Sequence, residues 1–246
     1  MGREVCRAVS VEPDLSLAAA VSHSVPGSTL AEAAGIEGPD GALVLVEHLA
    51  DLLHAEVDVL VDFTTRAHAP DHVAWGIANG VHVVVGTTGF PIDDAWRDAA
   101  VGVVVAPNFA IGAVLLMRFA EQAARYLPSA EVIELHHDRK LDAPSGTALL
   151  TAHRIAAARA GVADTPGGDD DAYPGARGAD IDGVRVHSVR LPGLVAHEEV
   201  VFGGPGQTLR LRHDSIDRTS FMPGVLLAIR AAPQRPGLTV GLDDLL

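Results

Sequence analysis

The sequence predicts an α/β fold in two parts: an open parallel sheet flanked by helices, then an α+β unit built on a mixed sheet. Between residues 15 and 107, short β-branched runs alternate with longer helix-like stretches. These runs are apolar along their whole length, as is typical of parallel strands buried on both faces. After residue 183 three strands follow one another, which favours a mixed sheet. We therefore expect a Rossmann-like first part.

The elements of the first part are assigned from this alternation. The expected strands are residues 15–21, 57–62, 81–85 and 101–105. The expected helices between them are residues 47–53, 70–79 and 93–100. Such an order places helices on both faces of the sheet.

The second part begins with a long helix at 111–126, where Leu115, Phe119 and Ala123 recur at four-residue spacing. The remaining expected elements are a strand at 130–135, a helix at 147–160, strands near 184–191, 197–202 and 208–213, and a helix at 219–230 that could pack back on the first sheet. Residues 161–182 are rich in Gly, Pro and Asp, and we expect a loop there.

The chain opens with a helix, whereas a dinucleotide-binding sheet opens with a strand and a glycine-rich turn. Val5, Ala8 and Val9 have helical spacing within residues 1–9. Without its central first strand the sheet would expose two edges. We therefore expect that a first strand is missing through a wrong start or a fragmentary source, with Met1 an internal residue of the turn. The alternative is a true start with a helix that caps the domain.

The composition excludes several function classes. The 32 acidic residues outnumber the 18 basic ones, and the net charge of −14 would repel duplex nucleic acid or an anionic membrane surface. No apolar run approaches the roughly 18 residues that span a bilayer. The single cysteine, Cys6, excludes an intrachain disulfide and fits a reducing compartment, so we expect a cytoplasmic protein.

Two histidines and a lysine follow the strand expected at 130–135. His136 and His137 sit at its end, so their side chains should point to opposite faces, and Lys140 lies in the loop beyond. Imidazole and ammonium groups together neutralise carboxylates and donate protons near neutral pH. They predict a site for a dicarboxylate that must be protonated. A metal site is the alternative, but no HExxH or cysteine partner accompanies the histidines, and we expect no metal.

Residues 144–147, Pro-Ser-Gly-Thr, stand directly before an apolar helical run. Gly146 lets backbone amides approach a ligand closely, and the start of a helix presents N–H donors with no partner inside it. The segment therefore predicts a carboxylate cradle. Ser145 as a plain helix N-cap is the alternative.

Three loops at expected strand ends are candidates for ligand binding. Residues 86–90, Gly-Thr-Thr-Gly-Phe, follow one strand, and residues 106–109, Ala-Pro-Asn-Phe, follow the next. Loops at the carboxyl ends of parallel strands are where such sheets bind ligands. Residues 62–64 close a third strand in the same way, although simple strand termination explains them equally well.

On these residues the chain resembles the 4-hydroxy-tetrahydrodipicolinate reductase (dihydrodipicolinate reductase) family, of the actinobacterial kind. The likeness runs from Met1 to the C-terminus, and its most specific motif is Glu-Leu-His-His at 134–137 with Lys-x-Asp-Ala-Pro-Ser-Gly-Thr at 140–147. The resemblance implies reduction of a cyclic imine or enamine dicarboxylate with NADPH or NADH in diaminopimelate and lysine biosynthesis. It also implies a nucleotide-binding domain of residues 1–108 and 219–246, a substrate-binding and tetramerisation domain of residues 109–218, and a homotetramer.

The resemblance also assigns roles to single residues. His136 matches the catalytic proton donor and acceptor, and Lys140 the second proton donor. The substrate-binding positions are His137, Gly146 and Thr147. The cofactor-binding positions are Met1, Ser22, His23, Gly86, Thr87, Thr88, Ala106, Pro107, Asn108 and Phe109. The implied reaction is hydride transfer to a ring carbon, with protonation by the His136 and Lys140 pair.

The chain departs from the family pattern in its nucleotide site. Most of the glycine-rich loop is absent, and Ser22 and His23 stand where the family commonly carries an acidic residue and often an arginine. Without a carboxylate to repel a 2′-phosphate, we expect use of both cofactors with a lean to NADPH. Two rival functions are a related amino-acid dehydrogenase on this scaffold and a catalytically silent protein that keeps only the dicarboxylate pocket.

Overall fold

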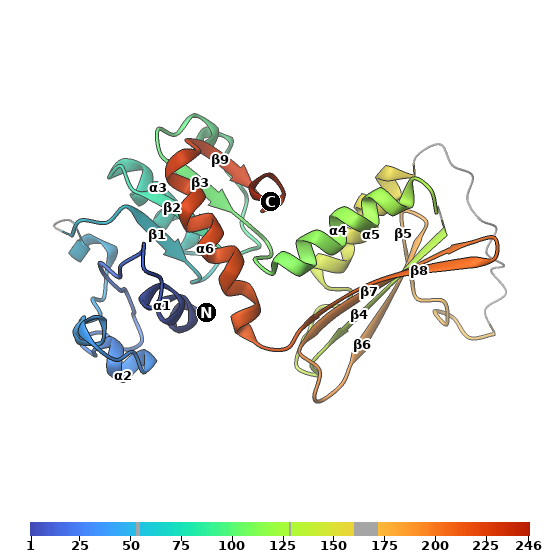
Figure 1. Ribbon diagram of the computed structural model, residues 1–246, viewed down its shortest axis with the longest axis horizontal. Coiled ribbons are helices and arrows are strands. Elements are labelled where there is room, and N and C mark those ends of the chain that lie inside the picture. The colour runs from blue at the N-terminus through green and yellow to red at the C-terminus, as the bar shows by residue number, and fades with distance from the viewer. Residues whose placement is uncertain (53–54, 128, 160–171) are drawn as a thin grey trace. The chain divides into compact units, whose positions relative to one another are not determined.

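The computed structural model describes residues 1–52, 55–127, 129–159 and 172–246. The chain divides into two units (Figure 1). The first is Met1–Phe109 with Phe221–Leu246, and the second is Ala110–Ser220. The first half of the loop expected at 161–182, and the last residue of the helices expected at 47–53 and 147–160, lie outside the described residues.

The first unit contains a four-stranded parallel sheet. Its strands are β1 (Val59–Asp62), β2 (His82–Val85), β3 (Gly102–Val105) and β9 (Gly237–Val240), in the order β1-β2-β3-β9. The expected parallel sheet and three of its strands are confirmed. β2 and β3 are buried almost throughout because helices cover the sheet. β9 was not expected, since only two of its four residues are large and apolar.

Two helices of this unit pack on the sheet, and a third packs on one of them. They are α1 (Gly2–Ser10), α3 (Ala69–Ala78) and α6 (Met222–Ala231). α3 lies close to β2 because Gly76 faces Val83, where a Cβ atom would come within 2.3 Å of a valine methyl. α6 packs against β2 and α1, so the helix expected at 219–230 does return to the first sheet (Figure 1).

Several expected elements of this unit are wrong. Residues 15–21 form no strand, because their only β-pairing is an isolated parallel bridge between Val21 and Val46. The helices expected at 47–53 and 93–100 are short 3-10 turns, η2 (Leu49–Leu52) and η3 (Asp94–Asp98). The Asp93 side chain accepts from the Ala95 amide and caps η3. A capping box between Thr29 and Glu32 starts the unexpected short helix α2 (Leu30–Ala34).

The second unit is a mixed five-stranded sheet with two helices on one face (Figure 1). The strands are β4 (Ser129–His136), β5 (Ala179–Ile181), β6 (Val184–Arg190), β7 (Ala196–Gly204) and β8 (Gln207–Ser215), in the order β5-β6-β4-β7-β8. β4 runs parallel to β6, and the other pairs are antiparallel. This confirms the expected mixed sheet.

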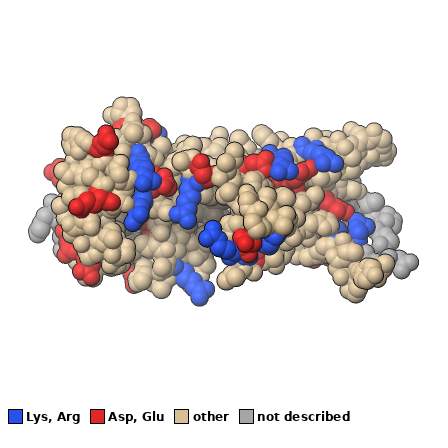
Figure 2. All heavy atoms as spheres, turned by 90° about the horizontal axis from the view of Figure 1, so that it is seen from below, with Lys and Arg blue, Asp and Glu red and all other residues tan. Residues whose placement is uncertain are grey.

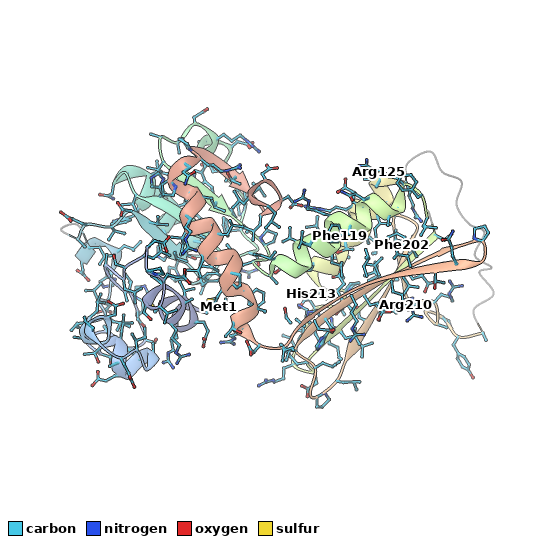
Figure 3. The ribbon with its side chains drawn as sticks, viewed as in Figure 1. Met1, Phe119, Arg125, Phe202, Arg210 and His213 are labelled. Atoms are coloured by element: carbon cyan, nitrogen blue, oxygen red, sulfur yellow. The ribbon has the colours of Figure 1, made fainter. Side chains whose placement is uncertain are left out.

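The helices of this unit are α4 (Ile111–Ala124) and α5 (Gly146–Ala158). Phe202 of β7 is fully buried in the core that they form with the sheet (Figure 3). Phe119 of the expected apolar stripe is instead half exposed, because α4 buries the neighbouring stripe that contains Leu116 and Ala120.

Two surface properties complete the description. No helix in the described part of the chain is long and apolar enough to cross a membrane. Acidic and basic side chains are interspersed on the face drawn in Figure 2.

Candidate active site

The most buried charged side chain of the second unit belongs to Glu134, which lies on β4 with none of its surface exposed. Arg190 donates to both of its carboxylate oxygens, at 2.8 and 2.7 Å. Nδ1 of His136 lies 2.5 Å from Oε2, and the Ser145 amide donates to Oε1 at 3.2 Å. A carboxylate buried in this way is stable only when its lone pairs are filled, and here they are.

Hydrogen bonding keeps Glu134 ionised. Burial alone raises the pKa of this carboxyl, but the hydrogen bonds from His136 and Arg190 outweigh it and lower the pKa to about 2. An ionised carboxylate only accepts, so Nδ1 of His136 must carry a hydrogen. The imidazole therefore exchanges protons with a ligand through Nε2.

Arg190 joins Glu134 to the loop that carries Lys140. It lies on β6, opposite His136 in the register with β4, and also donates to the backbone carbonyl of Asp142 at 2.8 Å. The Asp142 carboxylate accepts two hydrogen bonds from Nζ of Lys140, at 2.8 and 2.9 Å. The two residues expected to donate protons are thus attached to one buried ion pair.

The start of α5 is attached to the same carboxylate. Ser145 is the N-cap, since its Oγ accepts from the Ala148 amide at 3.2 Å, and its own amide donates to Glu134. The N-cap interpretation of Ser145 is therefore correct, and it orients the first turn, where Gly146 and Thr147 lie. A Cβ atom added to Gly146 would meet nothing within 4 Å, so the space beside this turn is open.

His136 and His137 have different surroundings. β4 ends at His136, whose side chain points to the same side as Glu134, and His137 lies beyond the strand. Nδ1 of His137 is buried and has no hydrogen-bond partner among the described residues. A buried polar atom of this kind calls for a partner, and a ligand carboxylate is a suitable acceptor.

In the first unit, Asp62 joins two loops at the carboxyl edge of the sheet. It is buried and accepts from Thr87 Oγ1 at 2.7 Å, from Thr64 Oγ1 at 2.8 Å, and is paired with His72. Burial raises the pKa of Asp62, but the hydrogen bonds from His72 and Thr87 more than offset it, so the pKa is lowered. The loop residues after β1 therefore do more than terminate the strand.

Gly86 is needed for packing at this edge. A Cβ atom there would lie 2.0 Å from the ring of Phe63, which in turn contacts the ring of Phe109, with 5.5 Å between the ring centroids. The loops after β1, β2 and β3 thus meet, as their position at the carboxyl ends of parallel strands requires.

The expected cofactor-binding residues differ in exposure. Thr87, Ala106 and Phe109 are buried, whereas Thr88 and Pro107 are exposed. The half-buried residues are Met1, Ser22, Gly86 and Asn108. Direct side-chain contact with a cofactor is therefore open to Thr88 and Pro107, while the buried side chains can only shape the loops.

His23 is exposed and has two histidine neighbours that the sequence analysis did not single out. Its ring centroid lies 5.4 Å from that of His48 and 6.1 Å from that of His68, and the rings of His68 and His72 stack. Ser22 forms a hydrogen bond with Ser24 at 3.2 Å between the hydroxyl oxygens. The position expected to meet the adenine ribose is thus rich in imidazole.

The roles of Glu134 and Arg190 were missed. Strict alternation along β4 places Glu134 on the same face as buried Val132, which was a readable signal. Arg190 lies 56 residues from Glu134, so its pairing depends on strand register and left no signal. Among the described residues, no group of three or more His, Cys, Asp or Glu side chains could hold a metal ion.

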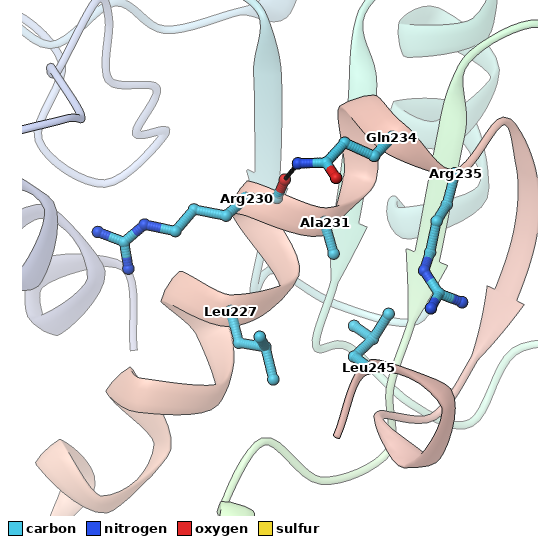
Figure 4. Close-up of a pocket in the computed structure, with 6 residues that line it drawn as sticks. All are labelled: Leu227, Arg230, Ala231, Gln234, Arg235 and Leu245. Atoms are coloured by element: carbon cyan, nitrogen blue, oxygen red, sulfur yellow. Dashed lines mark hydrogen bonds between the residues drawn. The ribbon is translucent and has the colours of Figure 1, made fainter.

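A pocket in the first unit is lined by none of the residues discussed above. It is lined by Leu227, Arg230, Ala231, Gln234, Arg235 and Leu245 (Figure 4). The guanidinium of Arg230 points away from the other lining residues and pairs with Glu12 and Asp14. We assign this pocket no part in the chemistry.

Comparison with known proteins decides the family. The sequence model described as "Dihydrodipicolinate reductase, N-terminus" matches residues 1–109, and "Dihydrodipicolinate reductase, C-terminus" matches residues 112–246. The chain belongs to the dihydrodipicolinate reductase family. This confirms the resemblance found in the sequence.

The similarity of this chain to individual members of the dihydrodipicolinate reductase family supports the assignment. The 4-hydroxy-tetrahydrodipicolinate reductase of Mycolicibacterium vanbaalenii is 53% identical over 225 residues, which cover 87% of this chain and 92% of the relative. That of Nocardia farcinica is 51% identical over 255 residues, covering 100% and 94%. The dipicolinate-bound dihydrodipicolinate reductase from Paenisporosarcina sp. TG-14 matches with a TM-score of 0.86 and 40% identity, covering 100% of this chain and 95% of that one.

Replacing Glu134 with Gln should destabilise the second unit by about 3–5 kcal/mol at pH 7, because the largely buried guanidinium of Arg190 would face a neutral amide. The folded-state pKa lies below the ordinary 4.5, so the stabilisation is complete above pH 4.5 and is lost as the pH falls toward 2. Urea denaturation at pH 7 and at pH 3 measures both effects. The loss of unfolding free energy caused by Glu134→Gln should be smaller at pH 3 than at pH 7.

The control is Glu121→Gln, which removes the same charge from an exposed pair with Arg125 on α4. It should change the free energy of unfolding by no more than about 0.5 kcal/mol. A Glu134→Gln penalty equal to that of the control would contradict the assignment of Glu134 as the centre of the site.

Proposed function

We propose that the chain catalyses the NAD(P)H-dependent reduction of 4-hydroxy-tetrahydrodipicolinate to tetrahydrodipicolinate in diaminopimelate and lysine biosynthesis. The hydrogen-bonded assembly around Glu134 carries the proposal, because it holds an imidazole, an ammonium and a helix start together in one unit. Membership of the reductase family supports the choice of substrate.

The chain supplies the protons of this reaction. When bound, the nicotinamide cofactor supplies a hydride to a ring carbon of the substrate. His136, held by Glu134 through Nδ1, donates a proton from Nε2 to the neighbouring enamine carbon. Lys140, held as an ammonium by Asp142, is the second donor and faces the negative charge of the substrate. Loss of the 4-hydroxyl group of the substrate as water, together with the addition of one hydride and one proton, balances the conversion to tetrahydrodipicolinate.

The start of α5 and His137 bind the carboxylates of the substrate. The backbone N–H groups of a first helical turn favour an anion, and Gly146 and Thr147 occupy that turn. The buried Nδ1 of His137 provides a further donor. The Paenisporosarcina enzyme is described with bound dipicolinate, and these positions fit such a dicarboxylate.

The carboxyl edge of the parallel sheet fits the nicotinamide cofactor. The loops after β1, β2 and β3 meet there and leave Thr88 and Pro107 exposed. Binding at this edge would sequester the cofactor against the strand ends.

The second unit also fits a homotetramer formed through its sheet. α4 and α5 cover one face, and the other face presents half-buried Ile133 and Leu135 of β4 beside charged side chains. Those charges are largely paired, as between Arg212 and both Glu199 and Asp214. A sheet face with an apolar centre and a paired polar rim is typical of an interface between copies.

Substitutions at His136 and Thr147 should separate proton transfer from binding. His136→Gln should lower kcat by about 10²- to 10⁴-fold with little change in the KM for substrate. Thr147→Ala should raise that KM by about tenfold and leave kcat within a few-fold. Steady-state kinetics with saturating NADPH measure both, and His153→Gln, an exposed change on α5, is the control. Effects on KM alone from both substitutions would contradict these roles.

We further propose that the chain uses both cofactors with a preference for NADPH, because Ser22 and His23 place no carboxylate where a 2′-phosphate would bind. The ratio of kcat/KM for NADPH to that for NADH should exceed one at pH 7. A preference for NADH of more than tenfold would exclude this assignment.

A further inference from the structure

A second buried acid lies opposite Glu134. Glu198 of β7 is the direct register partner of Glu134 and is 6% exposed. Its oxygen Oε1 lies 2.5 Å from the hydroxyl Oγ1 of Thr151 on α5. The mechanism above gives Glu198 no part, although it stands beside the carboxylate that organises the site.

The hydrogen bonds of Thr151 indicate whether Glu198 carries a proton. Oγ1 of Thr151 lies 3.0 Å from the backbone carbonyl of Thr147 and 2.5 Å from Glu198. A hydroxyl has one hydrogen to donate, and a carbonyl can only accept. Both contacts are satisfied at once when Thr151 donates to Thr147 and a protonated Glu198 donates to Thr151. An ionised Glu198 would take the hydroxyl hydrogen away from Thr147.

The surroundings of Glu198 favour the neutral form. Across β4 it faces the negative charge of Glu134, and across β8 its register partner is His213, which lies beneath the start of α4 (Figure 3). Burial lowers the pKa of His213, so it is neutral above pH 7. The sheet-facing side of α5 adds only the Thr151 hydroxyl, and that of α4 is apolar.

We propose that Glu198 is a positioning residue that works as a neutral acid: through Thr151 it holds the Thr147 carbonyl and so fixes the first turn of α5, where a substrate carboxylate binds. The binding part rests on the proposed function. Ionisation of Glu198 removes the hydroxyl hydrogen bond to that carbonyl and adds a second negative charge beside Glu134. The affinity for a dicarboxylate therefore falls as Glu198 loses its proton.

The pH range follows from the same burial. Burial raises the pKa of Glu198 to about 7, the hydrogen bond that Thr151 can donate to the ionised form opposes the rise, and the charge of Glu134 adds to it. Since the folded-state pKa exceeds the ordinary 4.5, the neutral form stabilises the fold fully below pH 4.5 and its contribution is lost as the pH rises through 7. Binding should weaken over the same upper range.

The test compares the wild type with Glu198→Gln, whose amide can donate to Thr151 at every pH. Calorimetry measures the Kd of dipicolinate from pH 6 to pH 8.5. If only the form with neutral Glu198 binds dipicolinate, the wild type should bind up to about 30-fold more weakly than Glu198→Gln at pH 8.5. The melting temperature of Glu198→Gln should equal that of the wild type at pH 6 and exceed it at pH 8.5. Glu121→Gln, which removes an exposed charge from α4, should follow the wild type.

Carboxyl ¹³C NMR on the same proteins isolates the acid itself. The wild type should show one glutamate resonance that titrates near pH 7 and is absent from Glu198→Gln. Titration of every glutamate below pH 5, or parallel Kd profiles for the two proteins, would overturn the proposal. If neither protein binds dipicolinate while the resonance titrates near 7, the substrate site is refuted and the neutral acid alone stands.

Discussion

One buried charge determines the geometry of the candidate site. Transferring a carboxylate such as Glu134 from water to a protein interior costs several kcal/mol, and the site is stable only because Arg190 pairs with both oxygens. That requirement fixes β4 against β6, brings the loop after β4 back to Arg190, and attaches the start of α5 through Ser145. His136 is oriented by the same carboxylate, so the proposed proton donor and the proposed carboxylate cradle share one support.

Two acids that face each other on neighbouring strands are used differently. Glu134 receives charged and neutral donors, which lower its pKa to about 2, whereas Glu198 contacts the Thr151 hydroxyl and burial raises its pKa to about 7. Only their surroundings make the two pKa values differ, since both residues are glutamates on the helix-covered face of one sheet. A second ionised carboxylate at Glu198 would compete with Glu134 for the same positive charge.

The sequence predicted the two sheets because hydrophobic periodicity records burial directly. It also singled out the His-His and Pro-Ser-Gly-Thr segments, which lie close together in the chain and are both attached to Glu134 in the structure. It failed where structure depends on partners distant in sequence. Residues 15–21 have the composition of a strand yet find only an isolated bridge, and the pairing of Arg190 with Glu134 depends on the register of β6 with β4. Periodicity carries no information about either.

The central claim is that ionised Glu134 fixes the tautomer of His136. Two-dimensional ¹⁵N NMR of the imidazole nitrogens at pH 8, with His136 assigned by its loss in His136→Gln, tests it most directly. The account predicts that neutral His136 carries its hydrogen on Nδ1 in the wild type, and that Glu134→Gln weakens this preference. A wild-type His136 protonated on Nε2, with Nδ1 bare, would contradict the account.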